Sequence, residues 1–169
     1  MDSTEIFITA LKYEEKIRDL YLSAVDIVDD ERGKTLFKAL ADDEQSHIDF
    51  LNYSLDTLKA DGIIEVARLE TPIPSQEQIR SQVETMKAKI PEKMLGDVKR
   101  VLNSALQMEI ETSAYYQDAS EKTEGKIKEI LEKFVEIEDR HVEVVQIELD
   151  YASKSGHWFN FMEVSMEVE

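Results

Sequence analysis

Four long stretches of this chain repeat apolar residues at steps of three and four, the spacing of one face of an α-helix. Because only five glycines and three prolines occur among 169 residues, few breakers interrupt these runs. The pattern therefore predicts an all-α fold. Its expected helices are four long ones and one short one, over residues of about 4–28, 33–59, 75–90, 97–123 and 126–153.

The link between the second and third long helices is much longer than the other two links. It spans roughly 35 residues and contains the short helix, whereas the links near 29–33 and 125 are tight turns. Tight turns make antiparallel hairpins, and one long crossover joins the two hairpins into a four-helix bundle. A chain of this length fits one domain, 1–169, with the bundle over about 4–153 and an apolar tail at 154–169.

The two hairpins repeat one pattern of chemically distinctive residues. The matched pairs are Glu14 with Glu109 and Tyr21 with Tyr116, 95 residues apart, and Glu44 with Glu138 and His47 with His141, 94 residues apart. A duplicated hairpin places matched residues around a pseudo-twofold axis. That is the symmetry of a site that holds two metal ions.

The repeated residues form a metal-ligand pattern. Glu44 and His47, like Glu138 and His141, are three residues apart and therefore share one helix face. Glu-x-x-His on two helices, with one Glu from each of the other two, is the ligand set of di-iron carboxylate bundles. The predicted metal-binding and catalytic residues are Glu14, Glu44, His47, Glu109, Glu138 and His141.

The charges of this ligand set balance, because two divalent ions offset four buried carboxylates. Carboxylate and imidazole ligands without thiolate favour two iron ions, with manganese or zinc as substitutes. The alternative is that the glutamates are solvated and the two histidines lie on the surface.

Composition excludes several classes of function. A net charge of −17 disfavours nucleic acid and anionic membranes as partners. The absence of cysteine excludes disulfides, thiolate zinc sites and iron–sulfur clusters. No apolar run approaches the length of a membrane span, and the first residues lack the features of a signal peptide, so we expect a cytoplasmic protein.

The segments ALKYEEKIRDLY and ADDEQSHIDFL, with ALQMEIETSAYY and FVEIEDRHVEVV, resemble the rubrerythrin family of the ferritin-like superfamily over about residues 4–150. The resemblance implies a di-iron centre that reduces hydrogen peroxide. It implies terminal ligation by Glu14 and Glu109 and bridging by Glu44 and Glu138, with one histidine on each iron. It also places Tyr21 and Tyr116 beside the cluster, although core packing is an equal alternative for both tyrosines.

Two features depart from that family's pattern. Full-length rubrerythrins carry a four-cysteine rubredoxin domain, so a chain without cysteine requires a separate electron-donor protein. Rubrerythrins also have a further glutamate three residues after the helix-three ligand, where this chain has Thr112, and Glu111 points to another face. Peroxide reduction therefore competes with two alternatives: ferroxidase or iron-handling chemistry with O₂, and a non-catalytic metal-binding module.

Several residues near the pattern have weaker interpretations. We expect Glu15 and Asp43 to face solvent, although Asp43 lies four residues before His47 and could instead orient it. His157 is expected to be structural or exposed rather than a ligand.

The tail is apolar at Trp158, Phe159, Phe161 and Met162, and residues 164–168 alternate as in a strand. We expect this tail to serve a homodimer contact or a cap. The alternative is that it folds back over its own bundle.

Overall fold

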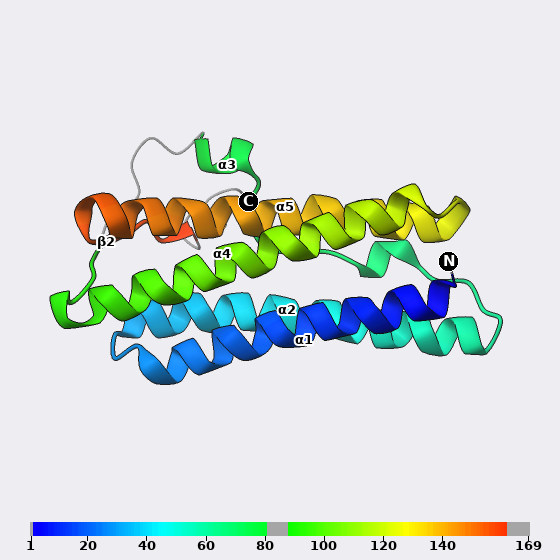
Figure 1. Cartoon of the computed structure of the whole chain (residues 1–169), viewed down its shortest axis with the longest axis horizontal. Coiled ribbons are helices and arrows are strands. Elements are labelled where there is room, and N and C mark those ends of the chain that lie inside the picture. Colours follow the sequence, from blue (N-terminus) through cyan, green and yellow to red (C-terminus); the bar gives the residue numbers. More distant parts are fainter. Residues whose placement is uncertain (1, 81–87, 162–169) are drawn as a thin grey trace.

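The computed structural model describes residues 2–80 and 88–161, and four long helices form its body (Figure 1). These helices are α1 Ser3–Ile27, α2 Glu31–Lys59, α4 Glu92–Glu121 and α5 Gly125–Ser155. Helices α1 and α2 run antiparallel, as do α4 and α5, and the chain crosses the length of the bundle between the two pairs. The predicted all-α, ferritin-like bundle with one long crossover is confirmed.

Capping residues set the ends of the helices close to their predicted positions. The side chain of Asp2 accepts a hydrogen bond from the Thr4 amide, and Asp30 accepts one from the Gly33 amide. These contacts satisfy amides that have no partner inside the first turn of a helix. At the far end of α5, Gly156 adopts φ 68°, a left-handed conformation that ends the helix with little strain.

Helix α4 begins five residues before its predicted start at residue 97, because Gly96 lies inside the helix and does not interrupt it. Pro91 occupies the N-cap position, where its missing amide hydrogen removes no helical hydrogen bond.

The described residues of the crossover hold a short helix and a strand where the sequence predicts one helix. The crossover holds a short 3₁₀ turn, η1 Val66–Arg68, and the five-residue helix α3 Gln76–Arg80, which lies on the outer side of α5 (Figure 1). The predicted helix at 75–90 is wrong at its end, because β1 Ala88–Lys89 pairs antiparallel with β2 His157–Trp158. Residues 81–87 lie outside the described part of the chain.

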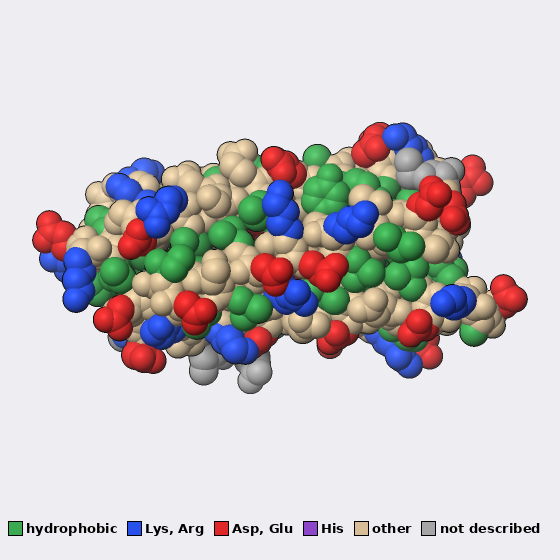
Figure 2. Space-filling view, turned by 60° about the horizontal axis from the view of Figure 1, so that its bottom comes forward, with side chains coloured by type: hydrophobic (Ala, Val, Ile, Leu, Met, Phe, Trp, Pro, Cys, Tyr) green, Lys and Arg blue, Asp and Glu red, His purple; other side chains and the backbone are tan. Residues whose placement is uncertain are grey.

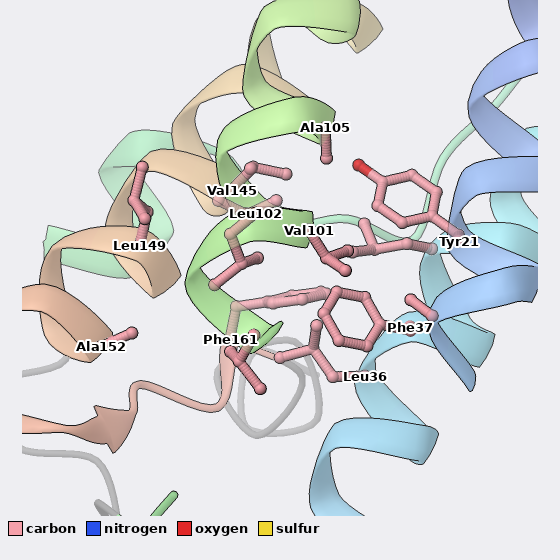
Figure 3. Packing of buried hydrophobic residues seen from close by; sticks show 14 of the residues in the cluster. Tyr21, Leu36, Phe37, Val101, Leu102, Ala105, Val145, Leu149, Ala152 and Phe161 are labelled. Atoms are coloured by element: carbon pink, nitrogen blue, oxygen red, sulfur yellow. The ribbon is translucent and has the colours of Figure 1, made fainter. Parts of the chain in front are cut away.

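The residues after α5 fold back onto the bundle. Trp158, Phe159 and Phe161 are buried in the chain's own core, as the alternative to a dimer contact predicted. Figure 3 shows Phe161 beside α4 in this cluster, with Phe37 of α2 in the same packing. His157 is half-buried, and its Nδ1 lies 2.7 Å from the Ser155 carbonyl oxygen, as expected of a structural residue. Met162 and the predicted strand-like residues lie outside the described part.

A buried carboxylate anchors this returning segment. Glu148 of α5 accepts hydrogen bonds from the backbone amides of Phe159 at 2.8 Å and Phe161 at 3.0 Å. Burial raises the pKa of Glu148 to about 7, against the lowering effect of those amides. The Trp158 indole nitrogen donates to Asp30 at 2.8 Å, which ties the segment to the start of α2.

The apolar interior is divided into two clusters. One surrounds Tyr21, Phe37, Val101 and Trp158, and the other surrounds Phe7, Phe50, Leu131 and Phe134. On each long helix, residues of one cluster come before the predicted metal ligands and residues of the other come after them. The predicted ligands therefore occupy a polar layer in the middle of the bundle, enclosed by apolar packing on both sides.

On the surface, acidic and basic side chains are interspersed with apolar ones along the face shown in Figure 2. Within the described residues, no helix is long and apolar enough to cross a membrane.

Candidate metal centre

The six predicted ligands converge in the polar layer, one from α1, one from α4 and two each from α2 and α5. All six side chains are fully buried: Glu14, Glu44, His47, Glu109, Glu138 and His141. The alternative, in which the glutamates are solvated and the two histidines lie on the surface, is therefore wrong.

The six side chains fall into two groups of four. In each group, one ligand atom per residue lies within 4.8 Å of the others. The groups are Glu14, Glu44, His47 and Glu138, and Glu44, Glu109, Glu138 and His141. Since Glu44 and Glu138 belong to both groups, the geometry accommodates two metal ions with these two carboxylates between them.

Each histidine directs the same ring nitrogen toward the carboxylates. The Nδ1 of His141 lies 2.9 Å from Glu44 and 2.8 Å from Glu109. The Nδ1 of His47 lies more loosely, 3.8 Å from Glu14 and 3.7 Å from Glu44. Nδ1 is therefore the nitrogen that each ring offers to a metal ion, and Nε2 is left for other partners.

Most of these buried polar atoms have no aligned hydrogen bond within the described part of the chain. On the side of the carboxylates they are one oxygen of Glu14, both carboxylate oxygens of Glu44, Glu109 and Glu138, and the Nδ1 atoms of His47 and His141; the Nε2 of His47 also has none. Buried polar groups without partners are strongly unfavourable in a folded protein. Two cations would satisfy these atoms and offset the carboxylate charge, so the residues fit a two-metal centre.

Burial and mutual repulsion perturb the carboxylates. Burial raises the pKa of Glu44 well above its usual range, and the negative charges of Glu14 and Glu109 raise it further. The same causes raise the pKa of Glu138. Burial also acts to raise the pKa of Glu14, but its contacts with Glu44 and His47 outweigh this effect and lower the pKa. Without metal, the two shared glutamates therefore bind protons more tightly than a solvated glutamate does.

The histidines respond in the opposite sense to burial. Burial acts to lower the pKa of His47, but the carboxylates of Glu14 and Glu44 raise it to about 10. Burial likewise opposes a charged His141, and the negative charges of Glu109 and Glu44 raise its pKa well above the usual value. Because a histidine must lose a proton to bind through Nδ1, metal ions compete with protons at these sites.

Asp43 is buried, and its expected exposure to solvent is therefore wrong. One carboxylate oxygen lies 2.7 Å from the Nε2 of His141, and the other lies 3.5 Å from the Nε2 of His47. Burial acts to raise the pKa of Asp43, but the hydrogen bond with His141 and the charges of His141 and His47 together outweigh it and lower the pKa. Asp43 thus contacts both imidazoles on the side away from the glutamates.

The crossover also reaches this cluster, which the sequence did not predict. Thr71 donates a hydrogen bond of 2.7 Å to the oxygen of Asp43 that contacts His141. Hydrogen bonds of this kind orient imidazole ligands and increase their basicity.

The two matched tyrosines are both fully buried, but they differ in their contacts. The Tyr116 hydroxyl donates to Glu14 at 2.8 Å, whereas the Tyr21 hydroxyl has no hydrogen bond within the described residues. Figure 3 shows Tyr21 reaching from α1 toward Ala105 of α4. Burial raises the pKa of both tyrosines well above the usual value, and Glu109 adds to this effect at Tyr21. Both tyrosines therefore lie beside the cluster as well as in the core.

The sequence predicts that Glu15 is solvated and that Glu111 points to another face than Glu109. Glu15 and Glu111 are exposed, and Thr112 is fully buried. The Thr112 hydroxyl donates to the Met108 carbonyl oxygen at 2.8 Å, one turn earlier in its own helix. The position therefore contributes a hydroxyl and no carboxylate to the layer.

A comparison with known protein families matches residues 5–144 to the family described as Rubrerythrin. The chain belongs to the rubrerythrin family. The matched range includes all six converging side chains, and members of this family bind two iron ions in such a bundle. No curated protein and no solved structure matches the chain.

Proposed function

We propose that this rubrerythrin-family protein is a non-haem di-iron oxidoreductase that reduces hydrogen peroxide with electrons from a separate donor protein. The supporting observation is the pair of overlapping four-residue groups, in which Glu44 and Glu138 belong to both. A structural site for a single metal would need only one such group. Two adjacent metal positions suit a reaction that transfers two electrons at once.

The residues of the chain have separate roles in this proposal. Glu14 and Glu109 would each hold one iron, Glu44 and Glu138 would be shared between the two irons, and each histidine would hold one iron through Nδ1. When bound, two ferrous ions supply the two electrons that convert peroxide, with two protons, into two water molecules.

The surrounding side chains keep the centre ordered and dry. Asp43 and Thr71 fix the orientation of the imidazoles, and the two apolar clusters exclude water from both ends of the layer. Tyr116 holds a proton on its phenol oxygen, 2.8 Å from Glu14, because burial raises its pKa.

Ferroxidase or iron-handling chemistry is the second candidate, and Thr112 is the observation that favours it. A glutamate at this position could bind or release a metal ion as the oxidation state of that ion changes. Thr112 has no carboxylate, and its hydroxyl donates to a carbonyl oxygen of its own helix, so it cannot act as such a ligand. Such a centre would react with O₂ as well as with peroxide.

Stopped-flow oxidation of the anaerobically iron-loaded protein distinguishes the two. If the proposal is correct, hydrogen peroxide oxidises the ferrous protein about a hundredfold faster than O₂ at equal concentration. Equal rates, or a faster reaction with O₂, would contradict the peroxidase proposal and favour ferroxidase chemistry.

Two neighbouring glutamates provide a matched pair of variants. Glu14→Ala removes a buried ligand, and we expect it to bind fewer than two irons and to lose fast peroxide oxidation. Glu15→Ala removes an exposed carboxylate from the next position and is expected to behave like the parent protein. If Glu14→Ala retains both irons and the full rate, the proposed ligand set is wrong.

A further inference from the structure

A cavity of about 330 Å³ opens on the side of the bundle formed by α1 and α4. Among the described residues, its lining comes from these two helices alone. The lining residues are Thr9, Lys12, Tyr13, Lys16, Ile17, Met108, Glu111 and Thr112.

This cavity lies on the side of the proposed metal centre that carries no histidine. Both imidazoles come from α2 and α5, and their outer nitrogens are covered by Asp43 and, through it, by Thr71 of the crossover. Among the described residues, the candidate ligands from α1 and α4 are Glu14 and Glu109, and Tyr21 and Tyr116 of the same helices lie beside them. A small ligand therefore meets fewer fixed groups when it approaches from the α1–α4 side.

The buried lining residues Ile17 and Thr112 connect the cavity to the polar layer. They follow Glu14 and Glu109 by three residues, one helical turn, and they occupy matched positions in the two hairpins, 95 residues apart. Both are almost completely buried, at 1% and 0% exposure, so they form the floor of the cavity. Because the Thr112 hydroxyl donates to its own helix, its oxygen can still accept a hydrogen bond from a ligand.

The exposed rim carries more positive than negative charge. Lys12 and Lys16 lie one turn apart on α1, opposite Glu111 of α4. In the described part of the chain, neither lysine forms an ion pair with a carboxylate. Two cations against one anion make this mouth locally positive, in a protein whose net charge is −17. Such a mouth attracts small anions that the rest of the surface repels.

We propose that this cavity is the binding and entry site for small inorganic anions, of the size of azide, that reach the metal centre past Thr112. Lys12 and Lys16 attract the anion, and Thr112 and Ile17 form the floor that it must pass. The assignment rests on the proposed di-iron function and adds to it a route and a class of ligand.

Azide binding to the oxidised, iron-loaded protein tests the charge of the rim, with the ligand-to-iron absorption band as the readout. Lys12→Gln with Lys16→Gln should weaken azide binding about threefold to fivefold at low ionic strength, from the loss of two charges at roughly 10 Å in water. The effect should shrink at high salt. The control is Lys122→Gln with Lys126→Gln, two exposed lysines near the α4–α5 turn, which changes the net charge equally and should leave azide affinity unchanged.

Substitution of the floor tests the route itself. Thr112→Leu should weaken or slow azide binding about tenfold or more, because the larger side chain fills the passage. Thr112→Val keeps the volume and removes the hydroxyl, so it should change azide affinity by less than Thr112→Leu. If Thr112→Leu does not fold, the exposed lysine pair still decides the question.

Iron content is measured first in every variant, so that two kinds of failure remain distinct. If the parent chain does not bind two irons, the proposed function fails. If it binds two irons, and the lysine and Thr112 variants bind azide like their controls, the function stands and the assignment of this cavity is overturned.

Discussion

Replacing Asp43 by asparagine should weaken metal binding strongly, although Asp43 is not expected to touch either metal ion. Its carboxylate lies 2.7 Å from the Nε2 of His141 and 3.5 Å from the Nε2 of His47, so one side chain supports both imidazoles. Removing the group that orients a histidine ligand typically weakens metal binding about tenfold to hundredfold, or about 1.4–2.7 kcal/mol. The larger loss is expected at the His141 position, because His141 forms a hydrogen bond with Asp43, whereas the Nε2 of His47 has none within the described residues.

Competition between the protein and a chromophoric chelator for cobalt(II) resolves the two binding steps. Asp42→Asn is the matched control, because Asp42 is adjacent in sequence but exposed, and it pairs with Lys38 on the same helix. Thr71→Val removes only the hydrogen bond to Asp43, and its effect should fall between those of the two aspartate variants. If Asp43→Asn binds both cobalt ions as tightly as Asp42→Asn, then Asp43 does not orient the histidines.

Two further predictions concern metal loading and packing. At pH 7, loading the metal-free protein with two divalent ions should release at least one proton per chain, because the pKa of His47 is raised to about 10, and affinity should fall as the pH falls. The raised pKa values of His141 and of the two shared glutamates act in the same direction. A pH-indicator dye measures the release, and loading without any proton release would contradict the raised histidine pKa. Gly33→Ala should lower the free energy of unfolding by about 1–3 kcal/mol, because a Cβ there would lie 2.9 Å from the Trp158 ring. Gly96→Ala, with open space around its Cβ, should be neutral or stabilising in the same urea titration, and similar behaviour of the two variants would refute the packing argument.

The sequence predicted the parts of this molecule that depend on short-range spacing. Helix positions follow from apolar periodicity, and Glu44 with His47 share a face because they are three residues apart. The internal repeat then related one hairpin to the other, which is why all six converging side chains could be named before their positions were known.

The interactions that the sequence did not predict join segments distant in the chain. Asp43 contacts His141, 98 residues away, and the repeat offers no guide, because the position matched to Asp43 is occupied by Ile137. A single aspartate on one hairpin therefore serves the histidines of both. The β1–β2 pair was also missed, because two residues per strand are too few for a periodic signal.

The return of Trp158 to the start of α2 has a consequence for how the protein matures during synthesis. Its ring packs edge-on against Phe37 with centroids 6.2 Å apart, and its indole nitrogen bonds Asp30, 128 residues earlier in the chain. The first hairpin leaves the ribosome long before residue 158 exists, so Phe37 lacks this part of its packing until residue 158 has been translated. A nascent chain of this protein therefore exposes apolar surface at one end of its first hairpin, and chaperone binding there should end when residue 158 emerges.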